Sequence, residues 1–193
     1  MRKYRAIDLT VWAAVMCLSE AAAHFALMAF PTEVFTFSVV LPVTLIAMMR
    51  WGWRGAPHAV LGGLVYSLLN GGGRAAVLAY TLGNAFAAVN LLWFTAIDKR
   101  RIRESALLTI AYALTGYTLM TLGRAAVASA IESAPFTGLF VRFASTDALS
   151  LVMAFIILLI ARREDKNGCV LQDQTEYLSQ LAEREQSAQK AAK

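Results

Sequence analysis

Three charged side chains interrupt apolar segments of this chain. Arg124 and Arg142 each lie within a long apolar segment, and Asp147 lies shortly after Arg142. An arginine guanidinium is planar and matches the geometry of a carboxylate or phosphate group. A charged group in an apolar segment usually faces a cavity, a ligand or an opposite charge. These side chains therefore indicate either a site for a small anionic or amide-bearing molecule, or an arginine–aspartate pair that joins two helices.

Helical spacing decides which of these residues face the same way. Arg142 and Thr146 are one turn apart on one face of a helix, whereas Asp147 points away from Arg142. Asp147 is therefore expected to pair with Arg124 on a neighbouring helix. Tyr80 and Asn84 are one turn apart on another segment. Asn70 and Arg74 lie at the ends of neighbouring segments. The candidate substrate-binding residues are therefore Asn70, Arg74, Tyr80, Asn84, Arg124, Arg142, Thr146 and Asp147.

Glu20 and His24 form a second polar pair, one helical turn apart in the first apolar segment. A carboxylate beside an imidazole can form a buried hydrogen bond, contact a ligand or relay a proton, and the sequence leaves these roles open. The other histidine, His58, lies in a different segment, so a set of three zinc ligands cannot be assembled. No nucleophile and base with catalytic spacing are recognisable. We therefore expect no enzyme activity, no cofactor and no metal site.

Apolar helices carry these residues. Hydrophobic residues make up 58% of the 193 residues, and the mean hydropathy is +0.54, which exceeds what soluble domains usually show. The apolar residues fall into blocks, several of which reach the roughly 20 residues needed to cross a bilayer. We predict an all-α integral membrane protein with a bundle of six transmembrane helices, at about 8–30, 34–49, 57–70, 74–97, 105–131 and 136–161. Pro42 is expected to kink the second of them.

The basic residues predict how this bundle is oriented. They lie at the N-terminus and after the second, fourth and sixth segments: Arg2, Lys3, Arg5, Arg50, Arg54, Lys99, Arg100, Arg101, Arg103, Arg162, Arg163 and Lys166. With six helices, all of these positions fall on one side of the membrane. The positive-inside rule places that side, with both termini, in the cytoplasm. The candidate binding residues then gather on the opposite side, which predicts a pocket open to the outside.

The composition changes abruptly after Arg163. We divide the chain into a transmembrane substrate-binding domain, 1–163, and a polar cytosolic tail, 164–193, that is partly helical or disordered. Leu171, Leu178 and Leu181 form a narrow apolar stripe if the tail is helical, so a docking helix for a partner is an alternative. The tail also leaves a different function open, that of a non-transporting membrane scaffold or assembly subunit that acts through these residues.

Small residues form stripes in the first segment. Ala13, Cys17 and Ala21 repeat every four residues, and so do Ala22 and Ala26. Such stripes let helix backbones approach closely, either within one chain or against another membrane subunit. The sequence alone does not separate these two uses.

The alanine-rich first segment, the expected topology and the stretch RWGWRGAPHAVLGGLVYSLLNGG at 50–72 resemble the S-components of energy-coupling factor (ECF) transporters. The resemblance implies a substrate-binding subunit of an ATP-driven (ABC) importer in the bacterial cytoplasmic membrane, with a vitamin or similar small micronutrient as its substrate. It implies a transmembrane coupling subunit and two cytosolic ATPases as partners. The alanine motif of that family contacts the coupling subunit, which carries over to Ala13, Cys17, Ala21, Ala22 and Ala26. Cys17 departs from the motif, because it replaces the central alanine.

Overall fold

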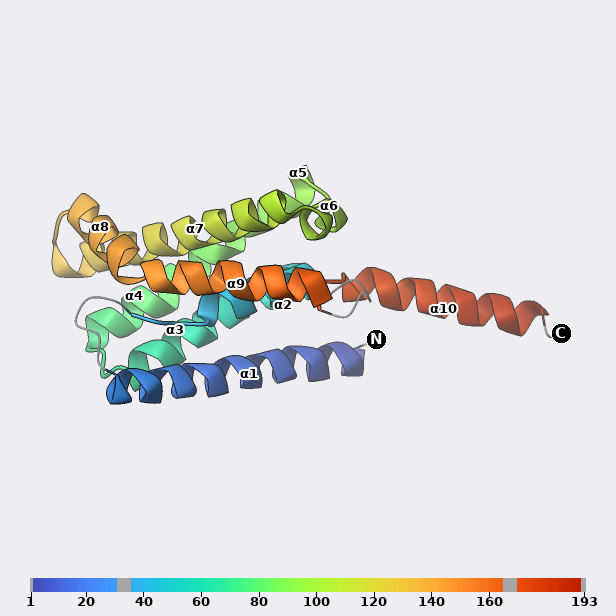
Figure 1. Cartoon of the computed structure of the whole chain (residues 1–193), viewed down its shortest axis with the longest axis horizontal. Helices are drawn as coiled ribbons and strands as arrows, with labels where there is room; N and C mark the ends of the chain where they lie inside the picture. Colours follow the sequence, from blue (N-terminus) through green and yellow to red (C-terminus); the bar gives the residue numbers. More distant parts are fainter. Residues whose placement is uncertain (1, 31–35, 165–169, 192–193) are drawn as a thin grey trace.

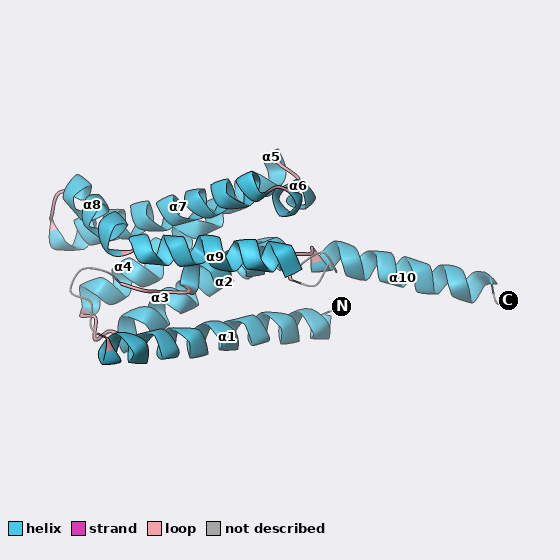
Figure 2. Ribbon diagram, in the orientation of Figure 1, coloured by secondary structure: helices cyan, strands magenta, loops and turns pink. Residues whose placement is uncertain are grey.

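The computed structural model describes residues 2–30, 36–164 and 170–191, and all the regular structure among them is helical (Figure 2). The predicted all-α class is therefore confirmed. Lys166, one of the basic residues used to orient the bundle, lies outside the described residues. The elements are α1 Arg2–Ala29, α2 Val40–Trp51, η1 Gly52–Gly55, α3 Pro57–Leu69, α4 Arg74–Asn84, η2 Ala85–Leu92, α5 Trp93–Ala96, α6 Lys99–Glu104, α7 Ala106–Glu132, α8 Phe136–Thr146, α9 Ala148–Glu164 and α10 Gln174–Ala191.

Several of these helices have the length and composition of membrane spans. Within the described part of the chain they are α1, α7 and the continuous stretch Arg74–Ala96, which joins α4, η2 and α5. The pair α8 and α9 becomes a further span if its two helices, which meet at a bend of 51°, are taken together. Apolar helices of this length are typical of an integral membrane protein.

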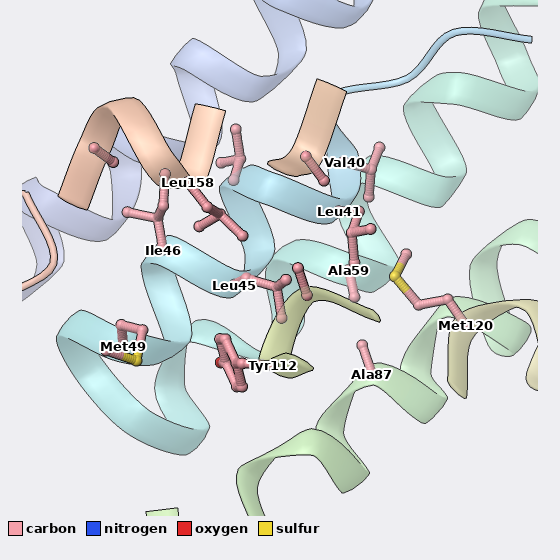
Figure 3. Close-up of a cluster of buried hydrophobic side chains, with 14 of the residues drawn as sticks. Val40, Leu41, Leu45, Ile46, Met49, Ala59, Ala87, Tyr112, Met120 and Leu158 are labelled. Carbon is pink, nitrogen blue, oxygen red and sulfur yellow. The ribbon is translucent and has the colours of Figure 1, made fainter. Parts of the chain in front are cut away.

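The short helix α2 is the centre of the bundle. All 12 of its residues are buried, and Figure 3 shows its side chains surrounded by those of other elements. A helix of 12 residues is about 18 Å long, well below the bilayer core of about 30 Å. The helix begins at Val40 rather than at the expected position near 34. Pro42 therefore lies in the first turn, where its missing N–H costs no helical hydrogen bond and no kink is required.

Polar groups from other helices hold the non-helical residues that precede α2. The Glu20 carboxylate accepts hydrogen bonds from the Val39 N–H at 2.6 Å and from the Ser38 hydroxyl at 2.9 Å. The Ser38 N–H donates to the Ser150 hydroxyl oxygen at 3.0 Å, and the Thr36 N–H donates to the Thr146 carbonyl at 2.8 Å. Non-helical backbone is tolerated inside an apolar bundle only when its polar groups are satisfied in this way.

Replacing Glu20 with alanine is expected to lower the free energy of unfolding by about 2 kcal/mol, because it leaves the Val39 N–H and the Ser38 hydroxyl without their buried acceptor. Glu20→Gln keeps one acceptor oxygen and should cost less. Unfolding of the detergent-solubilised protein by added dodecyl sulfate measures the difference. His24→Ala, one turn away, is the control, and a loss equal to that of Glu20→Ala would contradict this role.

The segment predicted at 136–161 breaks into α8 and α9 at Asp147. The Thr146 carbonyl, which a continuous helix would use in its own next turn, accepts the Thr36 N–H instead. The Asp147 carboxylate accepts hydrogen bonds from the Thr36 hydroxyl and from Arg124. The bend is therefore fixed by contacts to other elements.

The two ends of the bundle differ in charge. In Figure 1, α8 and the turn between α3 and α4 lie at one end, whereas the start of α1, α5 and α6 lie at the other. The end of α2 belongs to the second group, because Arg50 pairs with Asp8 of α1 at 2.7 Å. Both described chain ends lie on this side, and α10 projects away from the bundle there (Figure 1). The basic residues that follow the predicted segments therefore gather at one end, which we call the basic end.

Candidate functional site

A buried ion pair lies in the half of the bundle opposite the basic end. Arg124 of α7 pairs with Asp147 at the α8–α9 break, and the two residues are only 7% and 4% exposed. Arg124 Nε also donates to the Asn84 Oδ1 at 2.6 Å, and its guanidinium lies 4.6 Å from the centre of the Tyr80 ring. The predicted pairing of Arg124 with Asp147 is confirmed. So is the shared face of Tyr80 and Asn84, since both contact the same guanidinium.

Glycines bring α4 and α7 close enough for this network to form. A Cβ on Gly83 would lie only 2.5 Å from the Cα of Arg124, and a Cβ on Gly123 would collide with the Gly83 carbonyl. The two helix backbones are therefore in direct contact at the level of the ion pair. The sequence analysis found small-residue stripes in the first segment and missed this crossing, although Gly83 and Gly123 are adjacent in sequence to Asn84 and Arg124.

Next to the ion pair is a pocket of about 190 Å³, bordered by α4, α7 and α8. Tyr80 and Phe143 form an aromatic wall, with ring centres 5.8 Å apart and planes at 90°. Arg142 and Glu132 contribute exposed charged side chains. Hydroxyl and small apolar side chains complete the lining: Thr36, Thr146, Ala76, Ala79, Ala128 and Leu139.

The charges in this pocket differ from those that the sequence suggested. The guanidinium of Arg124 is already used by Asp147, Asn84 and the Tyr80 ring, and it does not border the pocket. Among the described lining residues, one cation and one anion remain, Arg142 and Glu132. The arrangement suits a small molecule with a flat ring and polar groups of both kinds, rather than a strongly anionic one.

The candidate substrate-binding residues fall into three groups. Tyr80, Arg142 and Thr146 line the pocket, and three others form the network beside it: Asn84, Arg124 and Asp147. Asn70 and Arg74 do not border the pocket. The Asn70 Oδ1 lies 3.3 Å from His24 Nδ1, and its amide donates to the Tyr66 carbonyl at 2.8 Å.

Seven of the ten lining residues were missing from the candidates, and three of these seven carry polar or aromatic side chains. These three are Thr36, Glu132 and Phe143. Glu132 could have been predicted from the sequence, because its charge is expected at the same end of the bundle as Arg142. Phe143 is one apolar residue among many, and Thr36 reaches the pocket only because α2 starts late.

Glu20 and His24, which were expected to form a pair, contact different parts of the protein. Glu20 is buried and holds the residues before α2, whereas His24 contacts Asn70. In the small-residue stripes of α1, the neighbouring helices partly cover Ala13, Cys17 and Ala21. Ala22 and Ala26 are exposed.

Within the described residues, no group of three or more His, Cys, Asp or Glu side chains could hold a metal ion. Comparison of the chain with protein-family models, with curated proteins and with solved structures gives no match. A function for this chain therefore has to be argued from its own residues and their geometry.

Proposed function

We propose that this chain is the substrate-binding subunit of a membrane importer, of the kind that the ECF S-components represent, and that it captures a vitamin-like small molecule in the pocket between α4, α7 and α8. The observation that carries the proposal is the pocket itself, which combines the aromatic wall of Tyr80 and Phe143 with the charges of Arg142 and Glu132. A concave, largely apolar site with a few placed polar groups is what small-molecule recognition requires.

The distribution of charge supports an orientation for this subunit. The basic end carries the arginine-rich ends of α1, α2, α6 and α9, so the positive-inside rule assigns it to the cytoplasm. The pocket then opens on the outer side of a bacterial cytoplasmic membrane. In this arrangement the chain passes six times between the two sides, with the buried helix α2 and the helix α3 as short passes.

The pocket lining favours a particular ligand chemistry. A flat ring would pack against Tyr80 and Phe143, an anionic or carbonyl group would bind Arg142, and a donor group would bind Glu132. The volume of about 190 Å³ suits a small molecule. The chain binds this molecule without changing it chemically. By the resemblance, two ATPases supply the energy for import through a coupling subunit, and α1 is the surface that contacts this subunit.

Replacing Arg142 with alanine is expected to reduce ligand binding at least about tenfold, because a charge-assisted hydrogen bond is lost. Thermal unfolding should be unchanged, since the side chain is exposed. Mass spectrometry of the small molecules released from gently purified protein identifies the ligand and measures its retention. Arg163→Ala, at the end of α9 that belongs to the basic end, is the matched control.

The same experiment can contradict the proposal. If the wild-type protein releases no small molecule and binds none from a vitamin mixture, the importer function loses its support. If Arg142→Ala and Arg163→Ala retain the ligand equally, the pocket is in the wrong place. The tail would then be the next part of the chain to test, as the docking element of a membrane scaffold.

A further inference from the structure

The residues that lead into α10 are built into the bundle. Leu171 is 2% exposed and belongs to the main hydrophobic core, and Gln174, the first residue of α10, is 4% exposed. Further along α10, Tyr177 and Leu181 are 42% and 40% exposed. The tail is therefore fixed to the bundle at residues 170–174, which we call the strap, whereas α10 projects from the basic end (Figure 1).

The strap binds a buried arginine that also binds α1. Arg50, at the end of α2, is 5% exposed, and its Nη1 donates a hydrogen bond to the Val170 carbonyl at 3.0 Å. Its Nε and Nη2 donate to the two carboxylate oxygens of Asp8 at 2.9 and 2.7 Å, and the Trp51 ring N–H donates to the same carboxylate at 2.5 Å. Because a bidentate pair fixes the plane of the guanidinium, Arg50 joins the strap, α2 and the start of α1 in one arrangement.

Two side chains of the strap contact other helices directly. The Tyr4 hydroxyl of α1 donates to the Gln174 Oε1 at 3.3 Å, and Lys99 of α6 pairs with Asp173 at 2.5 Å. The strap therefore contacts α1 and α6 directly and α2 through Arg50. Neither the outer pocket nor the Arg124–Asp147 ion pair uses these contacts.

The start of α1 has little other support from the bundle. Within the described residues of α1, the buried side chains all lie in its second half: Met16, Glu20 and Ala23. In the first half, the Leu9 carbonyl lies 3.0 Å from the His58 Nε2, and Trp12 is partly buried against the core. The contacts through Arg50 and the strap are therefore a large part of what holds the start of α1.

We propose that the strap is a conformational lock, which holds the start of α1 against the end of α2, and that displacement of α10 releases it. Moving the strap would expose Leu171, separate Gln174 from Tyr4 and withdraw the Val170 carbonyl from the buried guanidinium of Arg50, all in one step. The coupling is reciprocal, since the contacts that seat the strap on α1 also seat α1 on the strap. A partner that moves α10 would thereby loosen α1. The lock does not depend on the importer proposal.

Hydrogen exchange of the α1 backbone tests the lock. The full-length protein is placed in lipid nanodiscs, and the strap variant Leu171→Ala/Gln174→Ala removes the buried leucine and the acceptor that holds α1. We expect exchange in residues 6–12 to become about tenfold faster, because local opening no longer has to break these contacts. The matched control, Gln180→Ala/Leu181→Ala, removes the same two types of side chain from exposed positions of α10 and should leave this exchange unchanged.

The reverse variant tests the coupling from α1. Asp8→Asn breaks the buried charge pair with Arg50, so exchange in residues 174–180 should become about threefold faster or more. Glu104→Gln is its control, because it removes the acidic partner of Arg100 from an ion pair at the same end of the bundle whose side chains are 73% and 56% exposed. This change should leave exchange in α10 as it is in the wild-type protein.

The outcomes separate a lock from general destabilisation. Unchanged exchange in residues 6–12 of the strap variant, or equal acceleration in the strap variant and its control, would overturn the proposal. If the strap variant also accelerates exchange in α8, at the opposite end of the bundle, its effect is general and the reverse variant decides. Faster exchange at 174–180 in Asp8→Asn but not in Glu104→Gln then supports the lock, and equal rates in these two variants overturn it.

Discussion

Replacing Asp147 with alanine is expected to lower the free energy of unfolding by about 3–5 kcal/mol. The substitution leaves the guanidinium of Arg124 buried without its counter-charge, and among the described residues the Asn84 oxygen and the Tyr80 ring remain as its partners. It also removes one of the two acceptors of the Thr36 hydroxyl and leaves the Thr146 carbonyl at 3.3 Å, which weakens the link between the residues before α2 and the α8–α9 break. Denaturation by dodecyl sulfate in mixed micelles, followed by circular dichroism, measures the loss.

A double-mutant cycle measures the interaction between Arg124 and Asp147 separately from their contacts with other residues. Changing Arg124 and Asp147 together to leucine and alanine removes both charges, so the double variant should be more stable than Asp147→Ala alone. Arg142→Ala serves as the control, because this charge lies on the same helix as the break but is exposed, and it should change stability by less than about 0.5 kcal/mol. If Asp147→Ala costs no more than Arg142→Ala, the ion pair does not hold the bundle together.

The sequence predicted this ion pair because helical periodicity reveals which way each side chain points. Tyr80 and Asn84 share a face by spacing, and Asp147 points away from Arg142, which leaves Arg124 as its partner. Apolar blocks predicted the helical class in the same way. Both inferences depend on properties of a single segment: the spacing of residues along an α-helix and the length of an apolar stretch.

Periodicity could not predict where the helices break. The late start of α2 depends on Ser150 and Glu20, which lie far from α2 in the sequence. They accept the N–H groups of Ser38 and Val39, which a helix beginning near residue 34 would use in its own turns. The bend at Asp147 depends in turn on Thr36. These tertiary hydrogen bonds leave no mark on the hydropathy pattern, so continuous segments were predicted at both places.

The position of a residue along the bundle axis also did not predict whether its side chain lines the pocket. Asn70 and Arg74 were predicted as ligand contacts because they lie at the same end of the bundle as Arg142. Residues at one level can still face different directions around a bundle, and Asn70 faces His24 on α1. The sequence therefore placed the candidates at the end of the bundle where the pocket lies, but it identified only part of the pocket lining.

Adding a single methyl group at Gly83 is expected to cost about 3 kcal/mol or more of folding stability, at the upper end of what overpacking usually costs. The new Cβ would lie 2.5 Å from the Cα and the backbone nitrogen of Arg124, and neither helix can relieve this by moving a side chain. α4 and α7 would have to separate, which stretches the 2.6 Å hydrogen bond between Arg124 and Asn84. Gly83→Ala should therefore lower both the unfolding midpoint and ligand retention.

Gly138→Ala is the matched control for this prediction. Gly138 lies in α8, and no heavy atom lies within 4 Å of the position where its Cβ would be. Alanine there should leave stability unchanged or raise it by up to about 1 kcal/mol, because alanine favours a helix over glycine. Equal unfolding midpoints for Gly83→Ala and Gly138→Ala would mean that α4 and α7 do not touch at the backbone, and the positioning of Arg124 beside the pocket would then need a different explanation.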